Sequence, residues 1–230
     1  MFPGLKEHEK KRGCSNLLIK KGAEANLYLE EWHGRKVIIK RRNPKRYRVQ
    51  LLDEQIRTYR TAHEPQLMHE AKKAGVSTPT IFMINLADKS IIMEYIKGKQ
   101  VKQILNQLLN EERIKLCRRI GHFIGCLHKN GIIHGDLTTS NMILTPNGKI
   151  FFVDFGLGEF SRELEARGVD LHLMKRAFQS THYMYAEESF NAVLDGYAEA
   201  VGKDEAEKVL EKIKEIELRG RYVAERRKEH

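Results

Sequence analysis

A short hairpin with polar residues at both ends constrains the fold of this chain more than any other feature. Two apolar runs, residues 142–144 and 150–153, flank a Pro-Asn-Gly turn at 146–148, a pattern typical of a β-hairpin. A hairpin folds the chain back on itself, so Asn141 before the first run and Asp154 after the second come close in space. Both side chains offer oxygen atoms, which suit Mg²⁺ when it also keeps phosphate oxygens and water as ligands.

An acid just upstream of the hairpin completes a candidate catalytic group. The run His134-Gly-Asp-Leu-Thr-Thr-Ser-Asn precedes the hairpin, and Asp-Phe-Gly follows it at 154–156. Asp136 lies one loop away from the expected metal ligands, so its carboxylate is free to accept a proton from an incoming hydroxyl group or water. In order and spacing the two motifs resemble the catalytic half of a protein kinase, H-R-D-L-x-x-x-N followed by D-F-G.

Some features depart from that kinase pattern. Gly135 stands where regulated kinases carry an arginine that docks a phosphorylated activation loop, and Thr138 stands where they carry a lysine that contacts the transferred phosphate. The last proline of the sequence is Pro146, so no Ala-Pro-Glu element follows Asp-Phe-Gly. Residues 157–167 are too short for a regulated activation loop. We therefore expect no activation by phosphorylation of such a loop.

The residues before this half resemble the other lobe of a kinase. Residues 14–42 alternate like a β-sheet, and Lys40 ends the run Val-Ile-Ile-Lys, as does the lysine that reaches the nucleotide phosphates in kinases. The usual glycine-rich loop is absent, and the expected phosphate loop is Gly22, Ala23, Glu24 and Ala25. Its single glycine lets one stretch of backbone approach phosphate, while Glu24 would repel phosphate unless its side chain turned away.

A helical pattern from Leu51 to about Gly75 supplies an acid to pair with Lys40. Glu64 is the first candidate, and Glu70 on the same segment is the alternative. Pro65 is expected to break or kink the helix, or to open a second one at its first turn.

The adenine base is expected beside the run Met93-Glu-Tyr-Ile. Hinge peptides hold adenine through backbone groups, so the carbonyl of Glu94 and the amide of Ile96 are the candidate contacts, with Met93 behind the base. The chain is then α+β, with a protein-kinase-like bilobal fold whose C-terminal lobe is reduced and lacks the activation-loop region. Its expected parts are a β-rich N-terminal lobe at 1–93, a hinge at 94–98, and a helical C-terminal lobe with a basic tail at 99–230.

Charge points to a partner that the kinase motifs do not require. The net charge is +10, and a polyanion such as RNA would account for that excess. Residues 41–48 form one basic run, with Tyr47 able to stack on a base. A solvated charged face is the ordinary alternative for this run and for the tail. The candidate RNA-binding residues of the tail are Arg219, Arg221, Arg226, Arg227 and Lys228.

Composition also bears on the compartment. No run approaches the length of a membrane span, and the N-terminus lacks the apolar core of a signal peptide. The three cysteines have no zinc-ligand spacing, which favours reduced thiols. We expect a cytoplasmic protein without a membrane partner.

Taken together, the motifs resemble those of a specific family. Gly-Ala-Glu-Ala, the octad from His134 to Asn141, Asp-Phe-Gly-Leu-Gly from Asp154, Val169-Asp-Leu, Ser180-Thr-His and a terminal Arg-x-Arg-Tyr occur together. This set is similar to the small atypical serine/threonine kinases of the KEOPS complex, the PRPK family, which is related to RIO kinases, and here to its archaeal type. Pro65 directly after Glu64, and Glu70 in place of a basic residue, depart from that pattern.

The resemblance implies a function. It implies an ATP- and Mg²⁺-dependent kinase or ATPase, bound to a TsaD-like threonylcarbamoyl transferase and other KEOPS subunits, that acts in tRNA threonylcarbamoyladenosine modification. It also implies contact with tRNA through the basic tail. The alternatives are a nucleotide-responsive scaffold for tRNA and partners with vestigial chemistry, and a small-molecule phosphotransferase. The second would need an acidic substrate-binding lobe, whereas the expected helices end in basic charge.

Overall fold

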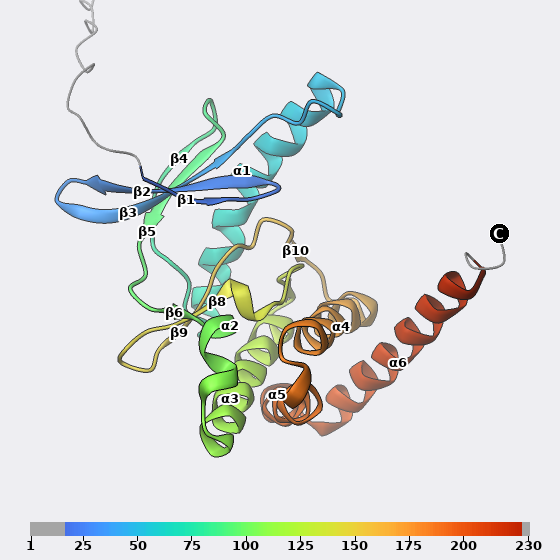
Figure 1. Cartoon of the computed structure of the whole chain (residues 1–230). Helices are drawn as coiled ribbons and strands as arrows, with labels where there is room; N and C mark the ends of the chain where they lie inside the picture. The colour runs from blue at the N-terminus through green and yellow to red at the C-terminus, as the bar shows by residue number, and fades with distance from the viewer. Residues whose placement is uncertain (1–16, 227–230) are drawn as a thin grey trace, which may run out of the picture.

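An antiparallel sheet with one long helix lies above a lobe made mostly of helices (Figure 1). The computed structural model describes residues 17–226, and the side chains of residues 17–219. The strands of the upper sheet are ordered β1-β2-β3-β5-β4. Their bounds are β1 Leu17–Lys21, β2 Ala25–Trp32, β3 Arg35–Arg42, β4 Ile81–Asn85 and β5 Ser90–Glu94. The bilobal kinase-like fold expected from the sequence is confirmed.

The hairpin of β2 and β3 sets the position of Lys40. His33 and Gly34 both take positive φ, 49° and 73°, as a two-residue hairpin turn requires. The strands then pair without a shift from Trp32 opposite Arg35 to Ala25 opposite Arg42. Lys40 therefore lies opposite Leu27 on one side and Ile91 of β5 on the other, within the sheet.

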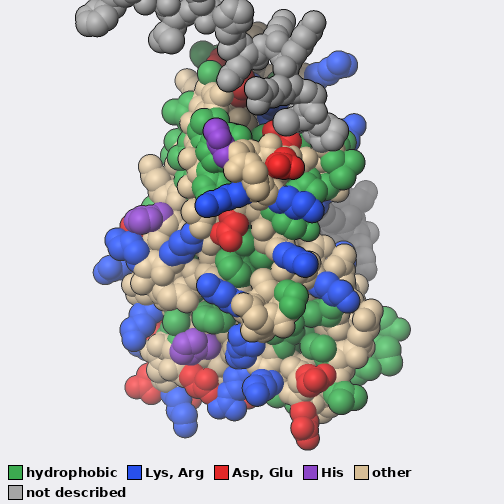
Figure 2. All heavy atoms as spheres, turned by 90° about the vertical axis from the view of Figure 1, so that its left-hand side faces the viewer, with side chains coloured by type: hydrophobic (Ala, Val, Ile, Leu, Met, Phe, Trp, Pro, Cys, Tyr) green, Lys and Arg blue, Asp and Glu red, His purple; other side chains and the backbone are tan. Residues whose placement is uncertain are grey.

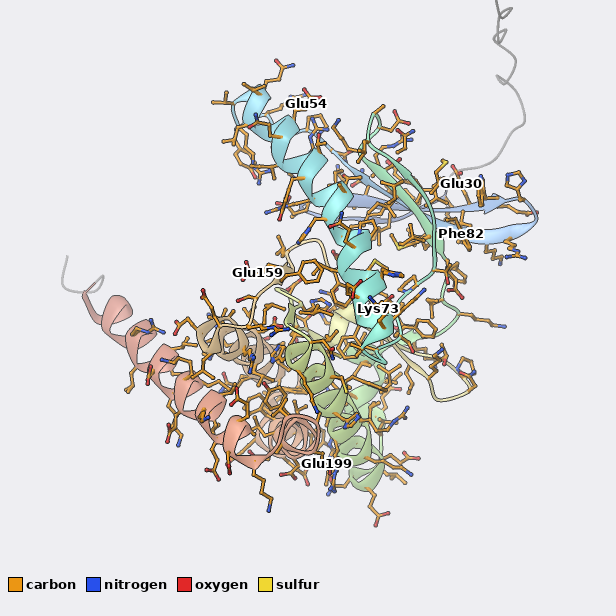
Figure 3. All side chains as sticks on the ribbon, turned by 180° about the vertical axis from the view of Figure 1, so that it is seen from behind. Glu30, Glu54, Lys73, Phe82, Glu159 and Glu199 are labelled. Atoms are coloured by element: carbon orange, nitrogen blue, oxygen red, sulfur yellow. The ribbon has the colours of Figure 1, made fainter. Side chains whose placement is uncertain are left out.

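The helix α1, Gln50–Lys73, is continuous through Pro65. Figure 3 shows it running from Glu54, beyond the edge of the sheet, to Lys73 at the second lobe. The expectation that Pro65 would break this helix or open a second one is wrong. Residues on both sides of the proline are buried, with Thr61 and Glu64 before it and Leu67 and Met68 after it. Their packing offsets the backbone hydrogen bond that proline cannot donate.

The lower lobe contains the predicted hairpin and the predicted helices. β8 pairs with β9 in register, with Ile143 opposite Phe151, so the hairpin is confirmed. The first helix of this lobe is a single turn, Val101–Ile104, which a 3-10 turn extends to Gln107. The elements are β6 Lys99–Gln100, α2 Val101–Ile104, η1 Leu105–Gln107, α3 Asn110–Lys129, β7 Ile132–Ile133, η2 Thr139–Asn141, β8 Met142–Leu144, β9 Ile150–Phe152, β10 Glu159–Phe160, α4 Leu164–Thr181, η3 Tyr183–Tyr185, α5 Ala186–Val201 and α6 Lys203–Arg226.

Glycines let α3 and α5 approach each other to backbone contact. A Cβ atom added to Gly121 of α3 would lie 1.9 Å from the carbonyl oxygen of Val193 on α5. A Cβ atom on Gly196 of α5 would lie 1.8 Å from the carbonyl oxygen of Arg118 on α3. α3 carries the buried residues Ile120, Ile124 and Leu127 of the lower core. None of the helices in the described residues is long and apolar enough to pass through a bilayer.

The change Gly121→Ala should therefore destabilise the fold. The added methyl group meets backbone, which cannot move aside as a side chain can, so we expect a loss of about 1–3 kcal/mol in the free energy of unfolding. Denaturant titration measures it. Gly168→Ala in α4 is the control, because its Cβ would meet the Lys212 and Ile216 side chains instead of backbone. An equal loss in both variants would contradict the proposed backbone contact.

Candidate functional site

Two adjoining cavities lie between the lobes. The first, of about 300 Å³, contains the phosphate-loop residues and the acids of the lower lobe. The second, of about 330 Å³, is lined by β-sheet side chains and by the run that follows β5. Both cavities are lined by Lys20, Leu27, Lys40, Asn141 and Asp154, so they lie directly side by side.

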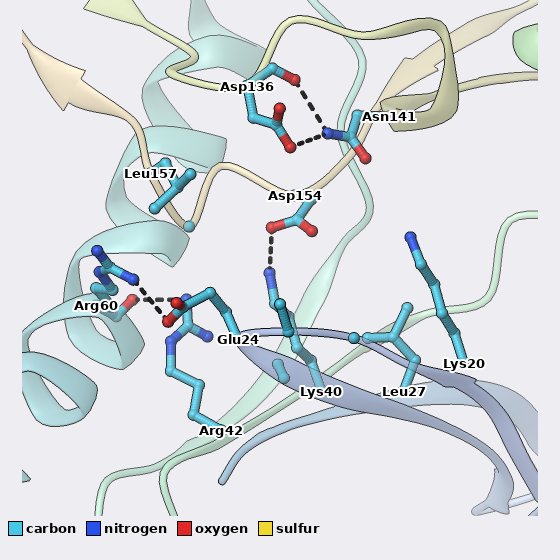
Figure 4. Close-up of a pocket in the computed structure, with 14 residues that line it drawn as sticks. Lys20, Glu24, Leu27, Lys40, Arg42, Arg60, Asp136, Asn141, Asp154 and Leu157 are labelled. Atoms are coloured by element: carbon cyan, nitrogen blue, oxygen red, sulfur yellow. Dashed lines mark hydrogen bonds and ion pairs between the residues drawn. The ribbon is translucent and has the colours of Figure 1, made fainter. Parts of the chain in front are cut away.

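Lys40 connects the upper sheet, α1 and the lower lobe. Its Nζ atom lies 2.7 Å from Oε1 of Glu64 and 2.6 Å from Oδ1 of Asp154. The residue is 4% exposed. Of the two acids that the sequence left open, Glu64 contacts Lys40, while Glu70 pairs with Lys73 on the surface of the same helix. Figure 4 shows Lys40 reaching from the sheet toward Asp154.

The ends of the β8–β9 hairpin meet at the first cavity. Asn141 donates its Nδ2 hydrogens to Oδ2 of Asp136, at 2.8 Å, and to the carbonyl oxygen of Asp136, at 3.0 Å. The amide nitrogen is thus occupied by Asp136, and no hydrogen bond within the described residues uses the amide oxygen. Asp154 takes a positive φ of 66°, a left-handed conformation that non-glycine residues rarely adopt. Asp136, Asn141 and Asp154 all line the same cavity.

The carboxyl group of Asp154 has a lowered pKa and is therefore ionised at neutral pH. Burial raises the pKa of its carboxyl group, but the adjacent Lys40 ammonium, together with His134 and Arg42, outweighs burial and lowers that pKa to about 2. A carboxylate with this pKa is available to a cation at any physiological pH.

The donor set at the hairpin fits a hard cation that brings other ligands with it. Asp154 and Asn141 offer a carboxylate and an amide oxygen, and no group of three His, Cys, Asp or Glu side chains within residues 17–219 could hold a metal alone. Mg²⁺ commonly binds through one or two protein oxygens and completes its shell with phosphate and water. These residues therefore fit Mg²⁺ bound together with a nucleotide.

The phosphate loop is held in place by an ion pair. The Glu24 carboxylate lies 2.8 Å from Nη1 of Arg60 on α1 and 3.5 Å from Nη2 of Arg48. Two guanidinium groups thus face its negative charge and offset the repulsion of phosphate that the sequence suggested. Position 22 has no room for a side chain, because a Cβ atom on Gly22 would lie 2.6 Å from the carbonyl oxygen of Ala25.

The second cavity has a largely apolar lining. Leu27, Ile38 and Val153 are among its apolar lining residues, and the run from Met93 to Ile96 forms one wall. Met93 is 7% exposed. The Glu94 side chain accepts a hydrogen bond from the Thr80 backbone N–H at 3.0 Å, so this carboxylate is engaged with the chain before β4.

Residues 134–141 form the candidate catalytic loop, which is held by Asp170 of α4, a residue to which the sequence analysis assigned no role. This side chain is fully buried and accepts hydrogen bonds from the backbone N–H groups of His134 and Gly135, each at 2.9 Å. Its Oδ2 atom also lies 3.2 Å from Nε2 of His128. The Asp170 carboxylate therefore holds the backbone of the two residues that precede Asp136. The only signal in the sequence was its place in the Val-Asp-Leu motif.

Gly135 explains the missing arginine of the kinase motif. Its φ is 79°, and a Cβ atom would lie 2.2 Å from the carbonyl oxygen of Leu157. The loop before Asp136 and the segment after Gly156 are in direct contact here, and no side chain fits between them.

A buried histidine supports the other end of the catalytic loop. Nε2 of His182 lies 2.9 Å from Oγ1 of Thr139, and its Nδ1 lies 2.6 Å from Oδ1 of Asn106. Burial and the nearby Lys102 lower the pKa of His182. The imidazole is therefore neutral at neutral pH and links the catalytic loop to both η1 and the end of α4. The Ser-Thr-His motif was visible in the sequence, but its contacts were not.

The candidate tail residues are only partly covered by the structure. Arg219 lies on α6 and is ion-paired with Glu165 of α4. Arg221 and Arg226 lie in the same helix, beyond the described side chains, whereas Arg227 and Lys228 lie outside the described residues.

Replacing Asp170 with asparagine should loosen the catalytic loop. The uncharged amide is a weaker acceptor for the two N–H groups and brings an N–H₂ group of its own into a fully buried place. We expect the free energy of unfolding to fall by about 3 kcal/mol. Chemical denaturation gives the value, and Asp195→Asn on the exposed face of α5 is the matched control. If Asp170→Asn lowers the free energy of unfolding no more than Asp195→Asn does, Asp170 does not hold this loop in place.

Comparisons with known proteins agree with this geometry. The protein kinase domain model matches residues 21–198. The chain is 51% identical over 211 residues to the KEOPS complex subunit Bud32 of Pyrococcus abyssi, covering 89% of this chain and 96% of that protein. It is 45% identical over 205 residues to a probable bifunctional tRNA threonylcarbamoyladenosine biosynthesis protein of Methanothermobacter thermautotrophicus, covering 89% of this chain and 36% of that protein.

A solved structure shows the same fold. The Rio2 kinase of Chaetomium thermophilum, crystallised with ADP, Mg²⁺ and phosphoaspartate, superposes with a TM-score of 0.62 at 16% identity, covering 89% of this chain and 71% of that one. The family model spans most of the chain, and more than half of the aligned residues are identical to those of the Pyrococcus protein. This chain belongs to the protein kinase family and, within it, to the Bud32 family.

Proposed function

We propose that this chain binds Mg²⁺-ATP and transfers the terminal phosphoryl group to a serine or threonine hydroxyl or to water, as an atypical kinase or ATPase. One observation carries the proposal. The side chains of Lys40, Asp136, Asn141 and Asp154 come from both lobes, yet they line one cavity of about 300 Å³. A convergent lysine, two acids and an amide around a phosphate-sized space are the parts that phosphoryl transfer needs.

Each residue of this group has a separate role. Lys40, held by Glu64, binds the α- and β-phosphates, and the backbone of residues 22–25 covers them. Asn141 and Asp154 would hold Mg²⁺, which neutralises phosphate charge when bound. Asp136 accepts the proton of the attacking hydroxyl group or water, and Asn141 keeps its carboxylate oriented through the 2.8 Å hydrogen bond. Catalysis then comes mostly from positioning and charge neutralisation.

The adenine base belongs in the second cavity. Its apolar lining would sandwich the ring, and the carbonyl of Glu94 and the amide of Ile96 would bind the base edge, with Met93 behind it. These assignments make residues 94–98 the hinge between an N-terminal lobe at 1–93 and a C-terminal lobe at 99–230.

The relatives suggest the process in which this chemistry is used. One similar protein is a KEOPS subunit by name, and a longer one, of which this chain spans about a third, is named for threonylcarbamoyladenosine biosynthesis in tRNA. We propose that this chain works in a KEOPS complex in the cytoplasm, beside a TsaD-like transferase and tRNA. Figure 2 shows Lys and Arg side chains spread over one face of the molecule, as contact with a polyanion requires.

A nucleotide-responsive scaffold is the second candidate. Lys40 and Asp154 bind each other in the structure, so a nucleotide must separate them before either can act. A chain that used this exchange only to report nucleotide binding to tRNA or to a partner would not need turnover.

The change Asp154→Ala distinguishes the two candidates. Loss of the metal-binding carboxylate should lower ATP turnover by at least about 100-fold, as measured by phosphate release. Asp88→Ala in the exposed β4–β5 turn is the control and should keep turnover. Intact turnover in purified Asp154→Ala protein would refute the enzymatic assignment, and a wild-type chain without turnover, alone or with transferase and tRNA, would favour the scaffold.

Removing the residues after Leu218 tests the RNA contact. If the tail contacts tRNA phosphates, the shortened chain should bind tRNA more weakly, and its affinity should fall less steeply with salt, by a slope of about one per lost phosphate contact. Filter binding at several salt concentrations measures both quantities. Unchanged affinity and slope would remove the tail from the RNA-binding surface.

A further inference from the structure

Glu64 has a second cationic partner that the kinase motifs do not include. Its two carboxylate oxygens are divided, with Oε1 at 2.7 Å from Nζ of Lys40 and Oε2 at 2.6 Å from Nη2 of Arg42. Lys40 and Arg42 are two residues apart on β3, so both side chains leave the same face of the strand. All three side chains are at most 5% exposed.

Arg42 also borders the first cavity, where we propose that the phosphates bind. It lines that cavity together with Lys40, Asp154 and Gly156. A Cβ atom on Gly156 would lie 2.9 Å from Nη2 of Arg42, so Gly156 packs directly against the guanidinium group. Within the described residues, Nε and Nη1 of Arg42 are buried without a hydrogen-bond partner. Figure 4 shows Arg42 beside Arg60 of α1, and its Nη2 atom lies 3.4 Å from the carbonyl oxygen of Arg60.

Four charged side chains balance one another in this cluster. Lys40 and Arg42 carry two positive charges, and Glu64 and Asp154 carry two negative ones. A bound triphosphate and its cation draw Lys40 and Asp154 toward themselves, so Glu64 loses part of the positive charge that Lys40 supplied. A carboxylate buried to 1% exposure cannot be left without a cation at low cost.

We infer that Arg42 is a positioning residue for phosphate binding, because it supplies the permanent counter-charge of Glu64 and thereby lets Lys40 turn to the nucleotide. Without Arg42, Glu64 and the phosphates compete for one ammonium group. With Arg42, Glu64 keeps α1 attached to β3 whether or not Lys40 is engaged. This inference rests on the proposed function, since it assigns Arg42 a role in binding Mg²⁺-ATP.

A double-mutant cycle tests whether Arg42 acts through Glu64. Calorimetry gives the Mg²⁺-ATP affinity of wild type, Arg42→Met, Glu64→Gln and the double variant. Arg42→Met should weaken binding about tenfold in the wild-type background, and by less than about twofold when Glu64 is already Gln. Arg42→Lys should restore most of the affinity, because one ammonium group still neutralises the carboxylate.

The control is a second buried arginine. Arg113 of α3 has a side chain 5% exposed and is paired with Glu188, outside both cavities. Arg113→Met should lower thermal stability as Arg42→Met does, yet leave the affinity for Mg²⁺-ATP unchanged. Equal losses of affinity in these two variants, or an unchanged loss from Arg42→Met in the Glu64→Gln background, would overturn the inference.

A readout without nucleotide separates this inference from the proposed function. The NMR signal of the Lys40 ammonium group should shift in Arg42→Met, because Glu64 then relies on Lys40 alone, and should stay in place in Arg113→Met. A wild-type chain that does not bind Mg²⁺-ATP would refute the proposed function, whereas an unmoved Lys40 signal would refute the role of Arg42.

Discussion

A carboxylate with almost no access to water connects the two secondary structures of the upper lobe. Glu64 of α1 contacts two cations of β3, and burial makes each of these three groups dependent on the others. Such a cluster contributes little to net stability compared with apolar packing of the same volume. It instead specifies one position of α1 against the sheet, since a small displacement of the helix would leave a buried charge without its partner. Lys40 reaches the first cavity between the lobes because this position is fixed.

The sequence predicted the parts of the site that follow from local pattern. The β8–β9 hairpin, the strand that ends in Lys40 and the order of the motifs are short-range features, and the structure contains a hairpin and strand where the patterns predicted them. The choice between Glu64 and Glu70 was also nearly local, because both lie on α1. These features could be predicted because the alternation of apolar and polar residues, and the turn residues between strands, occur at neighbouring positions of the sequence.

The rest of the site depends on contacts between distant segments. Asp170 acts on backbone 35 and 36 residues earlier in the chain, and His182 contacts Thr139 and Asn106 from 43 and 76 residues away. No periodicity records such contacts. Arg42 was missed for another reason, since it lies within the basic run 41–48, a pattern that is typical of a solvated surface. The prediction at Pro65 was wrong because the missing backbone hydrogen bond of proline can be foreseen from the sequence, whereas the packing of α1 that offsets this loss exists only in the folded lobe.

The segment after Asp154 has a further consequence for how the protein is controlled. It touches the catalytic loop at Gly135, and β10 then pairs with β7 through Glu159 opposite Ile133 and Phe160 opposite Ile132. Attachment at both places restricts how far Asp154 can move away from the first cavity. A kinase that is switched on by rearranging this region needs the segment to detach, whereas these two attachments favour a single arrangement of residues 154–160 beside the loop that carries Asp136.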